Sequence, residues 1–101
     1  MKGNTIGEFI DDLLLTGGPE KEFTFRTKYF FLETTSNRES GTLEMALDEY
    51  DNTAPENKKY ICTHSFAGDN FAECVAKFEN AEIFDGMTIY QAEQEVEVLF
   101  G

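Results

Sequence analysis

The stretch TLEMALDEYD, residues 42–51, decides the fold. Its apolar and polar residues alternate, which is the period of a strand with one buried face. The residues predicted to enter the core are Leu43, Met45 and Leu47. The stretch also lies in the segment 39–56, which holds six carboxylates and no Lys or Arg. One face is therefore expected to meet a core and the other to form a negative surface.

Three further strands are predicted around this one. Residues 21–35 are expected to form a hairpin with a turn at Thr27-Lys28, and residues 60–66 a fourth strand. The short connections favour an antiparallel meander. Residues 29–32, YFFL, are apolar on both faces. Either helices cover both faces there, or one face is reserved for another protein.

Helices are predicted on both sides of this strand block in the sequence. Residues 5–16 have an apolar stripe at helical spacing and are followed by Gly17-Gly18-Pro19, which stops a helix. Asp69 is the expected N-cap of a second helix, whose stripe is Phe71, Cys74, Val75 and Phe78.

A third helix is predicted to start at Thr88, where Thr88 and Gln91 have the spacing of a capping box. Its apolar face is expected to comprise Ala92, Val96, Leu99 and Phe100. The connector before it, residues 81–86, is expected to bury Ile83 and Phe84.

These elements predict one α+β domain spanning residues 1–101. It consists of a four-stranded antiparallel sheet with packed helices in the order α-β-β-β-β-α-α. No apolar run approaches the roughly 18 residues needed to cross a bilayer. The first residues, MKGNTIGEFIDD, contain carboxylates and do not read as a signal peptide. Two cysteines without a secretion signal indicate reduced thiols, so a cytoplasmic location is expected.

The charge is the most unusual property of the chain. Twenty Asp and Glu face eight Lys and Arg, a formal net charge of −12. This excess lies mainly in residues 39–56 and in residues 69–101, which hold eight acids and Lys77. Such a charge disfavours direct binding to nucleic acid or an anionic membrane and favours a basic protein partner. On the predicted last helix, Glu93 and Glu97 form a like-charge i, i+4 pair, which a sequence selected for stability alone would avoid.

Candidates for chemistry are few. Cys62, His64 and Cys74 supply three potential zinc ligands, whereas a structural zinc site needs four in paired spacings. We therefore expect two reduced core thiols, no metal and no cofactor. His64 is the one histidine, and no nucleophile motif accompanies it, so the protein is not expected to be an enzyme.

The small size, the charge of −12 and the clustered carboxylates together resemble small acidic phage and mobile-element inhibitors, the DNA-mimic and anti-CRISPR proteins. The resemblance implies inhibition of a Cas nuclease, or of another DNA-handling enzyme, by blocking its basic nucleic-acid channel. The residues predicted to bind such a partner are Glu44, Asp48, Glu49, Tyr50, Asp51, Glu93 and Glu97. The alternative is a structural or adaptor domain that binds a second copy or another protein through an aromatic strand face, such as Tyr29 and Phe31.

Overall fold

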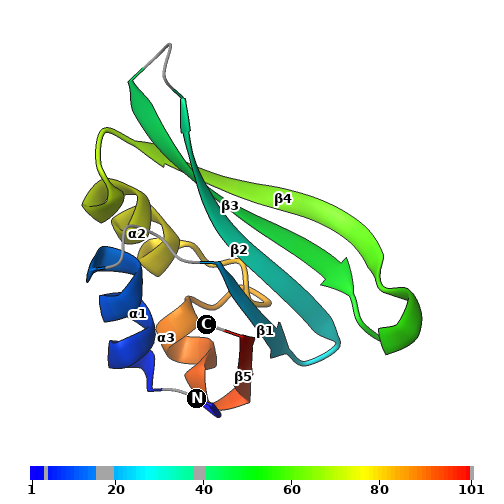
Figure 1. Cartoon of the computed structure of the whole chain (residues 1–101). Coiled ribbons are helices and arrows are strands. Elements are labelled where there is room, and N and C mark those ends of the chain that lie inside the picture. Colours follow the sequence, from blue (N-terminus) through cyan, green and yellow to red (C-terminus); the bar gives the residue numbers. More distant parts are fainter. Residues whose placement is uncertain (4, 16–19, 38–40, 101) are drawn as a thin grey trace.

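A computed structural model describes residues 1–3, 5–15, 20–37 and 41–100 of the chain (Figure 1). The elements follow in the order α1 (Ile6–Leu15), β1 (Lys21–Phe25), β2 (Lys28–Asn37), β3 (Thr42–Asp51), η1 (Pro55–Asn57), β4 (Lys59–Gly68), α2 (Phe71–Asn80), α3 (Ile89–Ala92), η2 (Glu93–Glu95) and β5 (Val96–Phe100). The predicted α+β class is confirmed, and β3 has the predicted bounds. Within the described ranges, no helix is both long and apolar enough to span a membrane.

The sheet has five antiparallel strands in the order β4-β3-β2-β1-β5. Strands β1 to β4 form the predicted meander, because each is hydrogen-bonded to the next along the chain. The prediction of four strands is wrong, since β5 pairs with the free edge of β1.

The predicted long helix from Thr88 is also wrong beyond its first turn. The capping box between Thr88 and Gln91 is present, and α3 starts there. The helix ends at Ala92, and after the 3-10 turn η2 the chain becomes extended. Val96 and Val98 then pair with Phe25 and Phe23 on β1. Pairing with β1 and the β preference of valine outweigh the local helical spacing. Glu93 and Glu97 are therefore not an i, i+4 pair on a helix.

All three helices lie on one face of the sheet (Figure 1), and the core fills the space between them. Met45 and Leu47 are fully buried there and Leu43 is partly buried, as predicted for this face of β3. Helices therefore cover only one side of the apolar stretch YFFL. The explanation that helices cover both of its faces is wrong (Figure 1). The core residues are Phe9, Ile10, Leu13, Phe23, Phe25, Phe30, Leu32, Met45, Leu47, Phe66, Cys74, Val75, Phe78, Phe84, Ile89, Ala92 and Val96.

Two local predictions differ from the structure. The β1–β2 turn is Arg26-Thr27 rather than Thr27-Lys28, and Arg26 has a positive φ of 53°. The N-cap of α2 is Asn70, whose side chain accepts a hydrogen bond from the backbone N–H of Glu73. The expected helix stop at residues 17–19 lies outside the described residues.

The first residues of the chain join the last strand. The backbone N–H of Lys2 donates to Val96 O at 2.9 Å, and the N–H of Val98 donates to Lys2 O at 2.8 Å. Gly3 follows with φ 86°, and a Cβ there would lie 2.6 Å from Val98 O. Only glycine fits this close approach of two backbones.

Candidate functional site

The side of the sheet opposite the helices carries most of the predicted partner-binding groups. We call this side the outer face, and it is made by the strand residues that alternate with the core. The register aligns its residues in rows across the strands. One row contains Glu97, Thr24, Tyr29, Tyr50 and Tyr60, and the next contains Glu22, Phe31, Asp48 and Thr63.

Three tyrosines form a ladder across the outer face. The rings of Tyr29, Tyr50 and Tyr60 meet edge to face, with centroid distances of 5.7 Å for both neighbouring pairs. Tyr60 is 58% exposed at the sheet edge. The hydroxyl of Tyr29 donates to Glu22, and partial burial together with this hydrogen bond raises the pKa of Tyr29 above its ordinary value. The Nζ atom of Lys58, from the β3–β4 loop, lies 4.8 Å from the Tyr29 ring centroid.

Carboxylates lie along one side of this ladder and at one end of its row. The register places five on the outer face, and among the described strand residues of that face none is Lys or Arg. Asp48 accepts a hydrogen bond of 2.6 Å from Thr63, which in turn lies 2.6 Å from the Tyr60 hydroxyl. At the other edge, Nζ of Lys2 lies 3.7 Å from Glu97. The five acids are Glu22, Glu33, Glu44, Asp48 and Glu97.

The structure thus brings four of the seven predicted residues to one face and separates three from it. Glu93 lies in η2, where its carboxylate is 3.7 Å from the amino group of Met1. Glu49 and Asp51 lie on the helix side of the sheet, since they pair with the buried Phe30 and with Lys28. The residues that share the outer face are Glu44, Asp48, Tyr50 and Glu97.

Glu49 belongs to a separate cluster with Cys62 and His64. Its Oε1 lies 2.9 Å from Nε2 of His64, and Cys62 Sγ lies 3.5 Å from the same nitrogen. Partial burial and the negative charge of Glu49 raise the pKa of the Cys62 thiol. Cys62 and His64 share a face as predicted, but Cys74 is elsewhere. It is fully buried, and its thiol donates to Leu43 O at 3.5 Å.

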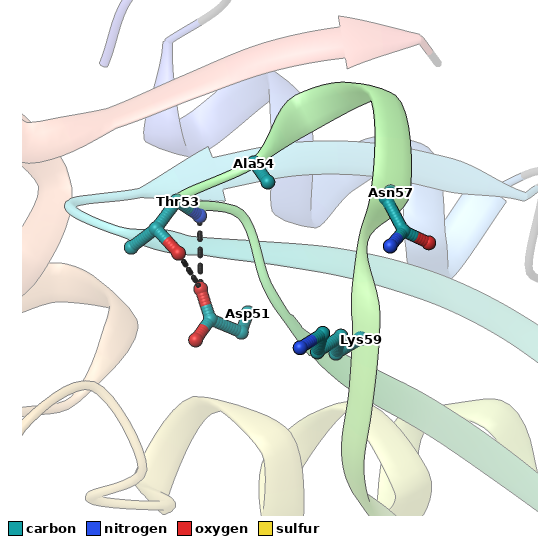
Figure 2. A pocket seen from close by; sticks show the side chains of 5 residues that line it. All are labelled: Asp51, Thr53, Ala54, Asn57 and Lys59. Carbon is teal, nitrogen blue, oxygen red and sulfur yellow. Dashed lines mark hydrogen bonds between the residues drawn. The ribbon is translucent and has the colours of Figure 1, made fainter.

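The Asp51 side chain bonds to Thr53 in the β3–β4 loop and does not lie on the outer face (Figure 2). Its Oδ1 accepts hydrogen bonds from the backbone N–H and the hydroxyl of Thr53, at 2.8 and 2.7 Å. These bonds lower the pKa of Asp51. The hollow beside it measures about 90 Å³, whereas pockets for organic ligands measure about 300–1,000 Å³. Its lining residues are Asp51, Thr53, Ala54, Asn57 and Lys59.

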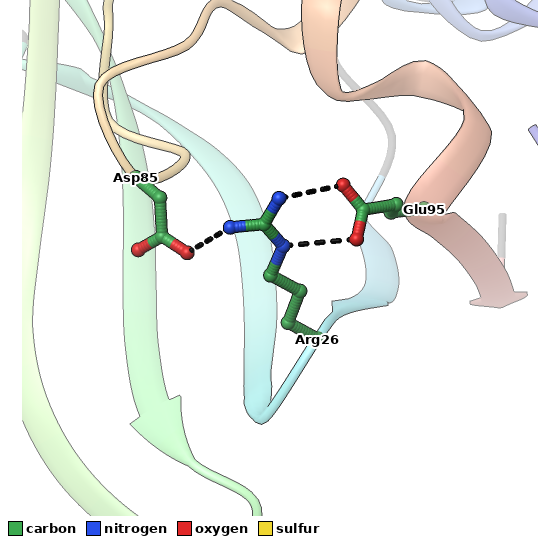
Figure 3. Close-up of polar contacts among 3 residues, drawn as sticks. All are labelled: Arg26, Asp85 and Glu95. Atoms are coloured by element: carbon green, nitrogen blue, oxygen red, sulfur yellow. Dashed lines mark hydrogen bonds and ion pairs between the residues drawn. The ribbon is translucent and has the colours of Figure 1, made fainter.

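At the neighbouring β1–β2 turn, whose Thr27 O accepts a hydrogen bond from the N–H of Asn52, part of the second acidic block is neutralised internally (Figure 3). Arg26 extends from the β1–β2 turn and contacts Asp85 at 2.8 Å and Glu95 at 2.8 and 2.9 Å. No sequence pattern pointed to this contact, because the three residues are 59 and 69 positions apart.

No family profile, curated protein or solved structure matches this chain.

Proposed function

We propose that this protein is an acidic protein-binding module that blocks the basic, nucleic-acid-binding groove of a partner such as a Cas nuclease. It would act as an inhibitor of the DNA-mimic, anti-CRISPR type. The observation that supports this is the outer face, where five carboxylates share one side of the sheet with a tyrosine ladder, on strands whose other side is fixed by the core.

The spacing of the charges suits a groove lined with Lys and Arg. Glu44 and Asp48 are four residues apart on β3, or about 13 Å at roughly 3.3 Å per residue. Glu22 and Asp48 lie in one row, two strands apart, which is about 10 Å. Since the sheet fixes these positions, little order is lost on binding. An excess of negative charge on this face also accelerates association with a basic partner and makes it dependent on salt.

The tyrosine ladder adds a second attraction for the same partner. Arginine guanidinium groups stack on aromatic faces, and a groove that binds nucleic acid is rich in arginine. The cation of Lys58 over the ring of Tyr29 is an example of this contact within the chain. A basic groove therefore complements both the carboxylates and the rings of the outer face.

The test is displacement of labelled duplex DNA from a panel of Cas nucleases and other DNA-binding enzymes at two salt concentrations. We expect displacement from at least one member, weaker at high salt. The variant E33K/E44K/E97K reverses three outer-face charges and is expected to lose the activity. Its control, E8K/D11K/E82K, makes the same charge change at three exposed positions outside the sheet.

Three results contradict the proposal. One is no displacement from any enzyme of the panel. The second is unchanged displacement by the outer-face variant. The third is equal loss in both variants, which would assign the effect to overall charge rather than to this face.

One observation favours the adaptor alternative. Strand β4 is an edge of the sheet, and its residues Tyr60 and Ile61 are 58% and 43% exposed. An exposed strand edge can pair with the edge of a second chain. Light scattering after size exclusion tests this: dimers that Y60K/I61K abolishes support the adaptor function, whereas a monomer at all salt concentrations excludes self-association.

A further inference from the structure

We propose that Glu49, Cys62 and His64 form a zinc-binding site with one position open to water. The proposal departs from the expectation of no metal, which counted only ligands that the sequence pattern grouped together. It is independent of the outer-face function.

Strand pairing brings the three ligands together. Glu49 on β3 is directly opposite Cys62 on β4, and His64 is two residues further along the same face of β4. One ligand atom from each residue lies within 4.8 Å of both others. Among the residues that the structure describes, this is the one such group of three.

The distances suit a tetrahedral metal. Zinc bonds of about 2.0–2.3 Å place neighbouring ligand atoms about 3.3–3.8 Å apart. Nε2 of His64 lies 3.5 Å from Cys62 Sγ and 2.9 Å from Glu49 Oε1. The first distance falls in this range, the second is a few tenths of an ångström short of it, and Cys62 Sγ and Glu49 Oε1 lie within 4.8 Å of each other.

The ligand types select the metal. A thiolate with an imidazole and a carboxylate suits zinc, whereas Mg²⁺ and Ca²⁺ prefer oxygen ligands alone. The deprotonated thiol and Glu49 together balance the charge of a divalent cation. The side chains of His64 and Glu49 are 25% and 14% exposed, so solvent reaches the cluster and can supply the fourth ligand.

A β-bulge beside the cluster provides a second observation. The register of β3 and β4 shifts between Glu49 and Tyr50 and leaves Ile61 without an opposite residue. The shift lets Cys62 face the helix side while Tyr60, two positions away, joins the outer face. Bulges redirect side chains in this way next to functional sites. The loop ends of β3 and β4 extend away from the helices (Figure 1), so a metal there would fix an arm that the helices do not cover.

The experiment is a titration of the reduced full chain with Zn²⁺ by calorimetry and with Co²⁺ by absorption. We expect one metal per chain, tetrahedral cobalt bands and a thiolate-to-cobalt charge-transfer band. C62S should lose the charge-transfer band, while C74A, which removes the buried second thiol, should keep it. E49Q should weaken affinity on the order of tenfold or more.

A second readout uses the wild-type chain. His64 is the one histidine, so Zn²⁺ should shift a single set of imidazole NMR signals. The proposal is overturned by an absence of binding, or by binding to carboxylates that gives no thiolate band. It is equally overturned by a band that survives C62S, or by imidazole signals that do not move at saturation.

Discussion

Arg26 binds Glu95 through two parallel hydrogen bonds, from Nε to Oε1 at 2.9 Å and from a terminal nitrogen to Oε2 at 2.8 Å. This fork-to-fork contact links the β1–β2 turn to the segment immediately before β5. The contact holds the residues just before β5, the strand that the local sequence pattern did not reveal.

The Arg26 contact predicts an acid-sensitive contribution to stability. Hydrogen bonding to Arg26 holds the pKa of Glu95 below its ordinary value of 4.5. A lowered folded-state pKa means that the contribution is present above 4.5 and is lost as the pH falls. We expect E95Q to lower the melting temperature at neutral pH, and the gap from wild type to close below 4.5. Thermal scans of both proteins across this range, with E82Q as a charge-matched control, check this; a gap that does not change with pH would contradict it.

The buried Lys21 predicts unequal roles for two adjacent aspartates. Lys21 is fully buried, and its Nζ lies 3.3 Å from Asp12 and 5.0 Å from the Phe9 ring centroid. D12A takes away a carboxylate that pairs with this buried ammonium and should reduce the free energy of unfolding by about 1–3 kcal/mol. D11A makes the same chemical change at the exposed neighbour and should have a much smaller effect. Urea unfolding of both variants decides the matter, and equal losses would argue against a special role for Asp12.

Among the residues of the connector 81–86, we expect substitution of Phe84 to cause the largest loss of unfolding free energy. Its side chain is fully buried and contacts the rings of four other phenylalanines at centroid distances of 5.1–6.5 Å. F84A should cost about 3–5 kcal/mol of unfolding free energy, because it removes apolar area and leaves a cavity. F31A on the outer face is the control and should cost clearly less. Denaturant midpoints report both, and a small loss for F84A would show that the core refills the space.

The hydrogen bond between Tyr90 and Glu79 predicts a contribution to stability that is lost at alkaline pH. A hydrogen bond to Glu79, aided by partial burial, raises the pKa of Tyr90 to about 12 from an ordinary value of 10.0. A raised folded-state pKa means that this contact stabilises the fold below pH 10 and ceases to do so as the pH rises through 12. E79Q should move the tyrosinate absorbance step of Tyr90 toward 10, with Y90F identifying that step. A step unmoved by E79Q would show that burial alone raises the pKa.

The sequence was sufficient for elements whose local pattern and tertiary partners agree. Residues 42–51 alternate in a way that only a half-covered strand satisfies, and β3 has those bounds. Phe84 was expected to be buried and is. Val96 and Val98 were misassigned because their partners, Phe25 and Phe23, are about seventy residues away, and no local pattern reveals such a pairing.

In the candidate site, too, local patterns were predictable from the sequence and long-range pairing was not. Alternation along β3 predicts that Glu44 and Asp48 share a face, and the register confirms it. Alternation alone also separates Glu49 and Asp51 from them, so the predicted partner-binding residues of β3 are divided between the two faces of the sheet. The contact of Glu49 with Cys62 depends on the register of β3 and β4, and the bulge at Ile61 that sets it has no sequence signal.

The pairing of Lys2 with β5 has a consequence for the order in which the molecule forms. The sheet edge at β1 is completed only after residues 96–100 have been synthesised, and Lys2 gains its backbone partners at the same moment. On the ribosome, the meander of β1 to β4 can form first, with Phe23 and Phe25 at an open edge. Final closure is thus a long-range event, and the edge of β1 stays unpaired until β5 is available.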